Sequence, residues 1–116
     1  MKQFVLYHNP RCSKSRQMLA YLEENSLSFD IREYLKQPLI LAELKSLRQQ
    51  LDCPVRELIR KTEVEYKEAG LNDTTLSDSQ LLQAIAQHPK LMQRPIVSNG
   101  KKAIIGRPLE NIEVLL

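Results

Sequence analysis

Apolar residues at the start of the chain follow a strand pattern, then a helix pattern, then a strand pattern again. Residues 3–7 read QFVLY, a short apolar run that stops at turn-forming residues and predicts a buried strand. Residues 13–25 carry apolar positions at helical spacing. Residues 27–31 alternate and predict a half-buried strand whose inward side holds Leu27, Phe29 and Ile31. Such a βαβ unit makes the two strands parallel.

The middle of the chain, roughly residues 36–92, is predicted to be a block of short helices. Apolar residues recur at helical spacing over 40–51, and Pro54 restarts a short helix. Residues 77–80 read SDSQ, which has the form of a capping box and marks another helix start. Pro89 ends that helix.

The chain ends in a predicted hairpin and a last helix. Two apolar runs, residues 95–97 and 103–105, flank an Asn-Gly pair, which is a strong hairpin signal. Apolar residues at helical spacing follow Pro108. These patterns together predict an α/β protein with a mixed β-sheet, flanking helices and a helical insertion.

Length and composition fit one compact unit of this kind. The 116 residues suit a single domain over 1–116, with its core in about 1–35 and 93–116 and the insertion in about 36–92. The net charge of +3 and the pI of about 9.0 are compatible with an anionic ligand. They are too weak to indicate nucleic-acid binding, and aromatic residues do not interleave with the basic ones.

Localisation and redox state can also be predicted. No stretch has the length and apolar character of a signal peptide or a membrane span, so we expect a cytoplasmic protein with no membrane partner. Cys12 and Cys53 suit a reducing compartment and do not suggest a disulfide framework. Together with His8 and His88 they match no zinc pattern, so no metal is expected.

The strongest chemical signal is the lone Cys12 in the stretch YHNPRCSKSR, residues 7–16. It falls at the predicted start of the first helix, where free N–H groups and the helix dipole stabilise a thiolate. His8 is a candidate for tuning the thiol, and the Ser15 hydroxyl is placed to donate to the sulfur. Because the stretch is polar, we expect Cys12 to be exposed. Further positive potential would come from Arg11, Lys14 and Arg16.

Each of these residues also has a simpler interpretation. Cys12 could be a small buried filler, although its polar neighbours favour a reactive thiol. His8 could be an ordinary loop residue, and the basic side chains could be solvated surface charges. Cys53 lies between predicted helices, where a structural role is favoured over a resolving thiol. Spacing alone does not bring three further arginines together; these are Arg60, Arg94 and Arg107.

Several motifs together nonetheless resemble the glutaredoxin- and glutathione-coupled arsenate reductase (ArsC-like) family of the thioredoxin-like superfamily. They are the cysteine stretch from His8 to Arg16, Ile59-Arg60, Gln93-Arg94-Pro95-Ile96 and Ile105-Gly106-Arg107-Pro108. The motifs cover nearly the whole chain and come in order.

The resemblance implies a thioredoxin-like fold and a set of roles. Cys12 would be the nucleophile toward arsenate, and Pro95 would follow a cis peptide bond beside it. The oxyanion would be bound by Arg60, Arg94 and Arg107. Glutathione would serve as co-substrate, with no bound cofactor, and glutaredoxin as the partner, because position 15 is serine and no neighbouring thiol is available.

Two other functions share this fold. One is a glutathione-dependent thiol oxidoreductase of ArsC-like type that acts on a different substrate. The other is a redox-linked regulator that binds RNA polymerase, which would sense oxidation through a Cys-x-x-Cys pair. Ser15 removes the second thiol of such a pair, so disulfide sensing in that form is not expected.

Overall fold

The computed structural model of the chain describes residues 3–116 and contains a four-stranded sheet in the order β2-β1-β3-β4. The parallel pair joins β1 to β2, and β3 is antiparallel to both β1 and β4. The predicted mixed sheet is therefore confirmed, with a βαβ unit at one end of the chain and a hairpin at the other. Its strands are β1 (Phe4–Tyr7), β2 (Phe29–Arg32), β3 (Ile96–Ser98) and β4 (Ala103–Ile105).

The helices fall where the apolar periodicity predicted them. The α-helices are α1 (Ser13–Glu24), α2 (Leu41–Leu51), α3 (Val64–Glu68) and α4 (Asp78–Gln87). Three further segments are 3-10 helices, including the one after Pro108: η1 (Val55–Leu58), η2 (Pro89–Leu91) and η3 (Leu109–Leu115). The predicted capping box is present, since the Ser77 hydroxyl accepts from the Gln80 N–H at 3.2 Å and the Gln80 side chain accepts from the Ser77 N–H at 2.8 Å.

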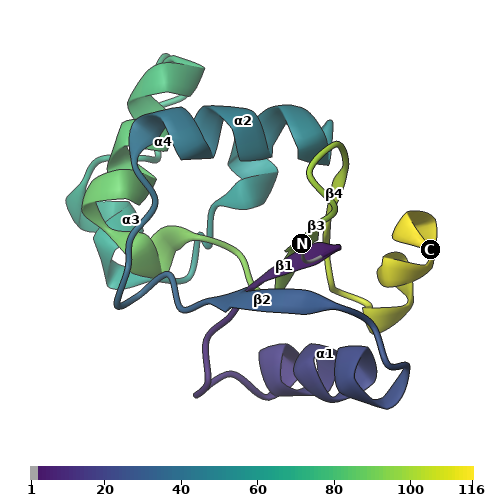
Figure 1. Cartoon of the computed structure of the whole chain (residues 1–116). Coiled ribbons are helices and arrows are strands. Elements are labelled where there is room, and N and C mark those ends of the chain that lie inside the picture. The colour runs from purple at the N-terminus through teal and green to yellow at the C-terminus, as the bar shows by residue number, and fades with distance from the viewer. Residues whose placement is uncertain (1–2) are drawn as a thin grey trace.

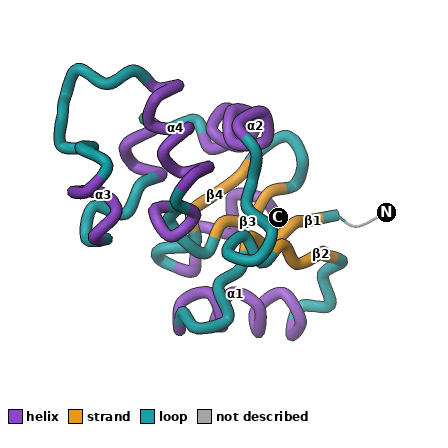
Figure 2. The backbone as a smooth tube through the Cα atoms, turned by 90° about the vertical axis from the view of Figure 1, so that its left-hand side faces the viewer, coloured by secondary structure: helices purple, strands orange, loops and turns teal. Residues whose placement is uncertain are grey.

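The sheet lies between two apolar layers (Figures 1 and 2). On one face, residues of α1 and η3 pack against alternate residues of the strands; this layer contains Phe4, Leu6, Met18, Leu22, Val97 and Ile112. On the other face lies the helical block, whose core includes Leu44, Leu47, Leu58, Ile85, Ile96 and Ala103. Because β3 sends neighbouring side chains to opposite faces, Ile96 and Val97 join different layers. Each fully buried leucine contributes about 2 kcal/mol to this arrangement.

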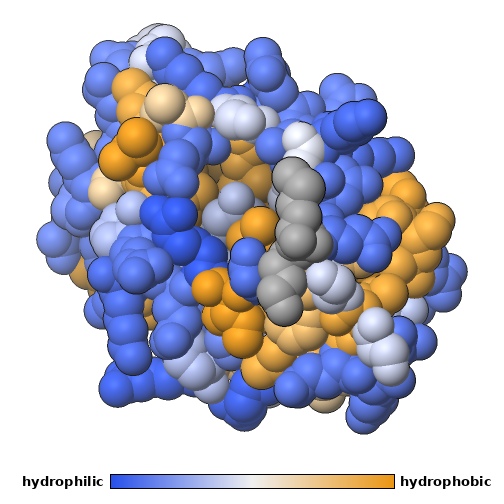
Figure 3. All heavy atoms as spheres, viewed as in Figure 1, coloured by the Kyte–Doolittle hydropathy of each residue, from blue (hydrophilic) through white to orange (hydrophobic). Residues whose placement is uncertain are grey.

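Two apolar residues that the pattern placed inward are exposed. Ile31 is 49% exposed because β2 is an edge strand and no strand covers its outer side. Ile40 is 64% exposed because it precedes α2 as its N-cap rather than lying on its inner face. The other exposed apolar residues include Val114 and Leu116, and Figure 3 shows the apolar surface that gathers over η3. Among the described residues, no helix combines the length and apolar character needed to cross a bilayer.

Candidate active site

Cys12 is the N-cap residue of α1, held by the turn that leaves β1. Its backbone is extended, with φ −94° and ψ 123°, and its N–H donates to the Asn9 carbonyl at 3.0 Å. The prediction that Cys12 is exposed was wrong, since the residue is only 9% exposed. Local sequence did not show this because part of the cover comes from far along the chain: Arg107 Nη2 lies 3.5 Å from the sulfur.

The pKa of the Cys12 thiol is set by opposing effects. Burial raises the pKa, because a thiolate is less well solvated there. The N–H groups of Ser15 and Lys14 in the first turn of α1, together with the N–H groups and charge of Arg94, lower it by more. The net shift is downward, so a larger share of the thiol is ionised near neutral pH than for an ordinary cysteine.

Ser15 and His8 contact each other rather than the sulfur. The Ser15 hydroxyl lies 2.7 Å from His8 Nδ1 and accepts from the Asn9 N–H at 3.0 Å, and both side chains are buried. The expected hydroxyl donation to Cys12 is therefore replaced by a contribution from the Ser15 backbone N–H. Burial lowers the pKa of His8, so the imidazole is neutral at pH 7 and is not a cation beside the thiolate. His8 contacts the turn that carries Cys12 through the Ser15 hydroxyl.

The basic side chains next to Cys12 in sequence are solvated. Arg11, Lys14 and Arg16 are exposed, and Arg16 Nη1 donates to the Pro10 carbonyl at 3.0 Å. Lys14 acts on the thiol through its backbone N–H. The side-chain charges that reach the sulfur therefore come from other segments of the chain.

Arg94 and Arg107 are brought to Cys12 by the sheet and by a close backbone approach. The Arg94–Pro95 and Arg107–Pro108 peptide bonds are both cis. The Gly106 N–H donates to the Pro95 carbonyl at 2.8 Å, and a Cβ on Gly106 would lie 2.6 Å from Met18 Cε. Any larger residue at position 106 would require Met18 and the Pro95 ring to shift, so glycine allows the end of β4 to approach α1 closely. Arg107 Nε then donates to the Arg94 carbonyl at 2.7 Å, so the two arginines are held together.

Arg60 joins them through a residue that the sequence did not single out, Glu63. The carboxylate oxygen Oε1 of Glu63 accepts from Arg60 Nη1 at 2.5 Å and lies 3.8 Å from Arg94 Nη1. All three side chains are largely buried, with exposed fractions between 15% and 26%. The structure thus brings together all three predicted arginines, and one carboxylate lies between two of them.

A hollow beside Arg94 is lined by two residues whose buried donor atoms have no acceptor. We call it the Arg94 hollow; its volume is about 250 Å³ and its lining includes Asn9, Arg11, Tyr34, Glu63, Lys90 and Arg94. Within residues 3–116, the buried Tyr34 hydroxyl and Arg94 Nε find no hydrogen-bond partner. Burial raises the pKa of Tyr34 to about 12, so its hydroxyl keeps its proton and is a donor. Sequence reasoning missed Tyr34, because nothing distinguishes it from a core residue.

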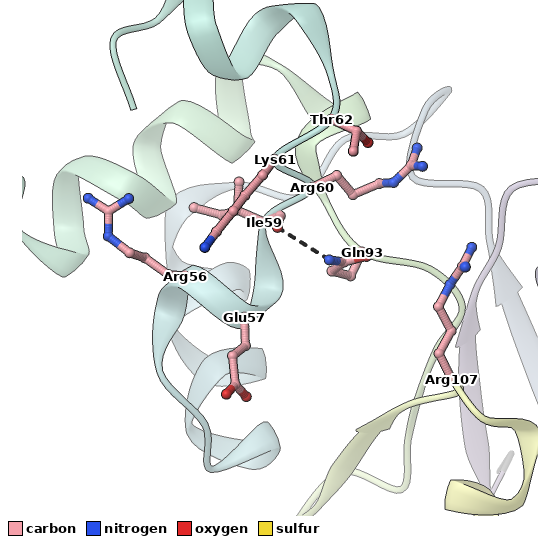
Figure 4. Close-up of a pocket in the computed structure, with 8 residues that line it drawn as sticks. All are labelled: Arg56, Glu57, Ile59, Arg60, Lys61, Thr62, Gln93 and Arg107. Atoms are coloured by element: carbon pink, nitrogen blue, oxygen red, sulfur yellow. Dashed lines mark hydrogen bonds between the residues drawn. The ribbon is translucent and has the colours of Figure 1, made fainter. Parts of the chain in front are cut away.

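A second, larger groove is lined by Arg60 and Arg107. We call it the Arg107 groove; its volume is about 520 Å³ and its lining includes Ile59, Arg60, Lys61, Thr62, Gln93 and Arg107. Figure 4 shows Arg60 and Arg107 extending toward the same end, whereas Arg56 and Glu57 point away from it. Gln93 Nε2 donates to the Ile59 carbonyl at 3.2 Å, and this bond joins two segments that line the groove. The groove is therefore cationic at the end nearest Cys12.

Cys53 lies elsewhere, in the turn between α2 and η1. It lines a different hollow with Arg48 and Asp52, and both cysteines are free thiols. Among the described residues, no group of three or more His, Cys, Asp or Glu side chains is placed to hold a metal ion. The reactive groups of the site are thus one thiol and its arginines.

We expect the pKa of Cys12 to lie below that of an ordinary thiol and the pKa of Cys53 to lie above it. The pKa of Cys12 is lowered for the reasons above, whereas burial and the charge of Glu57 raise the pKa of Cys53. Alkylation by iodoacetamide, followed against pH in the Cys12→Ser and Cys53→Ser variants, measures each thiolate separately. Cys12 should reach its maximal rate at the lower pH. Equal or reversed titration midpoints would contradict the described electrostatics.

Comparison with known proteins places this geometry in a family. The model of the ArsC family matches residues 7–115. An arsenate reductase from Neisseria meningitidis is 45% identical over the full length of both chains, and the uncharacterized protein YfgD of Escherichia coli is 47% identical over 96% of this chain and 94% of its own. The solved structure of an arsenate reductase from Vibrio cholerae superposes with a TM-score of 0.95 at 45% identity, covering 99% of this chain and 98% of its own.

Proposed function

The chain belongs to the ArsC family, and on that premise we propose that it reduces arsenate to arsenite through a thiol–arsenate adduct on Cys12. The observation that carries the proposal is one activated thiol with Arg94 and Arg107 beside it and Arg60 joined to Arg94 through Glu63. Guanidinium groups suit the oxygens of a tetrahedral anion, and they offset the repulsion between that anion and the thiolate. The same groups would therefore bind the substrate and permit the attack.

The first step forms the adduct without a change in oxidation state. The Cys12 thiolate attacks arsenic and forms an S–As bond, while an As–O bond breaks and the oxygen leaves as water after protonation. Arsenic remains in the +5 state. Arg94 and Arg107 would hold the remaining oxygens during this exchange.

Two electrons must then come from a second thiol. Position 15 is serine and Cys53 lines a different hollow, so we propose glutathione as the thiol that acts on the adduct. Its thiolate attacks the Cys12 sulfur, an S–S bond forms, and the S–As electron pair leaves with arsenic as arsenite. The mixed disulfide is then reduced by glutaredoxin, which restores the Cys12 thiol. A glutathione-dependent reaction requires a reducing compartment, and we therefore place it in the cytoplasm.

The Arg107 groove supports this order of events. Glutathione carries two carboxylates, and the groove provides Arg60, Lys61 and Arg107 as cations around a volume of about 520 Å³. Arg107 both lines the groove and contacts the Cys12 sulfur, so a thiol entering there would approach the adduct. The Arg94 hollow would receive the oxyanion.

The assay that tests the function combines the purified protein, arsenate, glutathione and glutaredoxin, and measures arsenite. We expect turnover with all components and none when either thiol component is omitted, because one thiol on the protein cannot complete a two-electron reduction. Phosphate in place of arsenate controls for non-specific thiol oxidation. Absence of arsenite with folded protein would refute the arsenate assignment and favour a different substrate for the same thiol.

A further inference from the structure

Glu63 holds its carboxylate between two of the arginines that the proposed function assigns to the substrate. It is the N-cap residue of α3, yet its side chain makes no bond to the first turn of that helix. Its oxygen Oε1 instead lies 2.5 Å from Arg60 Nη1 and 3.8 Å from Arg94 Nη1. Arg94 is 31 positions away in sequence, so the contact is more than a local pair within one helical turn.

The Glu63 carboxylate contacts Arg60 and Arg94 but leaves other nearby donors without a hydrogen-bond acceptor. Arg94 Nε and the Tyr34 hydroxyl are buried and have no hydrogen-bond partner within residues 3–116. Both side chains line the Arg94 hollow together with Glu63. Buried donors without an acceptor are costly, so they favour a ligand that brings more oxygens than a carboxylate does.

We propose that Glu63 occupies the oxyanion seat in the free protein and that the substrate displaces it, gaining Arg94 Nε and the Tyr34 hydroxyl as additional donors. The identity of the substrate in this proposal rests on the proposed function. The location of the binding site rests on the geometry of the Arg94 hollow. A tetrahedral oxyanion carries four oxygens, enough to replace Oε1 of Glu63 on both arginines and to reach the two free donors. Anion replaces anion, so the charge of the arginine cluster stays compensated throughout.

Glu63 thereby acts as a positioning residue that also competes with the substrate. It keeps Arg60 directed toward Arg94 when no anion is bound, which spares the cluster the repulsion of uncompensated guanidinium groups. The same contact lowers the apparent affinity for any oxyanion, because binding must first break it.

The test measures anion binding without turnover. Calorimetry with arsenate and with inorganic phosphate on the Cys12→Ser protein removes the chemical step and needs no reductant. Adding Glu63→Gln should tighten both anions roughly tenfold, since a neutral amide holds the arginines less strongly than a carboxylate. Tyr34→Phe should weaken them roughly tenfold, since the hydroxyl would lose a bond to a charged acceptor.

Glu65→Gln is the matched control. It removes the same charge from the same helix, and Glu65 forms no ion pair among the described residues. Little change in anion affinity is expected from it. Glu63→Asp, whose shorter carboxylate reaches the two arginines less well, should give an intermediate effect and provides a second variant if Glu63→Gln fails to fold.

A second readout separates displacement from a purely structural role. In protein that retains Cys12, Glu63→Gln should lower the pKa of the thiol, because Arg94 then shares its charge with no carboxylate. Weaker or unchanged anion binding in folded Glu63→Gln protein, or an unchanged thiol titration, would overturn the proposal. These measurements are independent of the arsenite assay. Tighter anion binding in Glu63→Gln without arsenite formation by the parent protein would refute the proposed function but support the displacement of Glu63 by an anion.

Discussion

Replacing Cys12 by serine is expected to abolish arsenite formation, with a loss of at least about a thousandfold in kcat/KM. A serine hydroxyl does not ionise near neutral pH, and the amide groups and arginines that lower the pKa of the thiol cannot make it a comparable nucleophile. The arginine cluster is unchanged, so arsenate binding measured by calorimetry should be largely preserved. Loss of turnover with retained binding is the signature expected of a nucleophile.

Cys53→Ser is the matched control for that variant. Cys53 is the other free thiol, its pKa is raised by burial, and it lines a hollow away from the arginines. Arsenite formation should stay within about twofold of the parent protein, the range of a substitution outside the reactive groups. A loss in Cys53→Ser as large as in Cys12→Ser would show that two protein thiols take part and would refute the single-thiol mechanism.

Arg94→Ala is expected to give the second largest effect, a loss of about a hundredfold in kcat/KM, the size seen when one preorganised donor is removed. Arg94 lowers the pKa of Cys12 and is proposed to bind the oxyanion, so both contributions would be lost together. The change in the pH–rate profile follows from the loss of the effect of Arg94 on the pKa of Cys12. Without Arg94 the thiol pKa rises, the thiolate is lost at a higher pH, and the acid limb of the pH–rate profile moves upward.

Arg94→Lys distinguishes the two contributions of this side chain. Lysine keeps the positive charge, so the acid limb should move less than in Arg94→Ala, while the lost fork should still raise KM for arsenate. Arg16→Ala serves as control, because Arg16 is close to Cys12 in sequence but is exposed and bonds to the Pro10 carbonyl. An equal shift in Arg16→Ala would contradict the finding that Arg94, and not the neighbouring Arg16, lowers the pKa of the thiol.

The elements of the fold could be predicted because each is encoded within a short window. The alternation in β2, the spacing in α2 and the capping box at Ser77 depend on a few neighbouring residues. The exposure of Ile31 could not be predicted in the same way. It depends on the strand order, which makes β2 an edge, and strand order follows from pairing between distant segments.

The site was predicted unevenly for a similar reason. The resemblance brought Cys12 together with the three arginines, and the structure does place them around one centre. Glu63 carried no signal, since several glutamates surround it in a helical stretch and only folding shows which one meets Arg94. Ser15 was placed at the right centre, but its hydroxyl turned to His8 because a buried imidazole competes for it.

The distance along the chain between Cys12 and Arg107, 95 residues, has a consequence during translation. Cys12 leaves the ribosome well before Arg94 and Arg107, whose side chains lie at the sulfur in the folded chain. Until β3 and β4 have joined β1, the thiol lacks the contribution of Arg94, and only the N–H groups of α1 are in place to lower its pKa. We therefore expect the pKa of Cys12 in a partly synthesised chain to lie closer to the ordinary thiol value than in the folded protein.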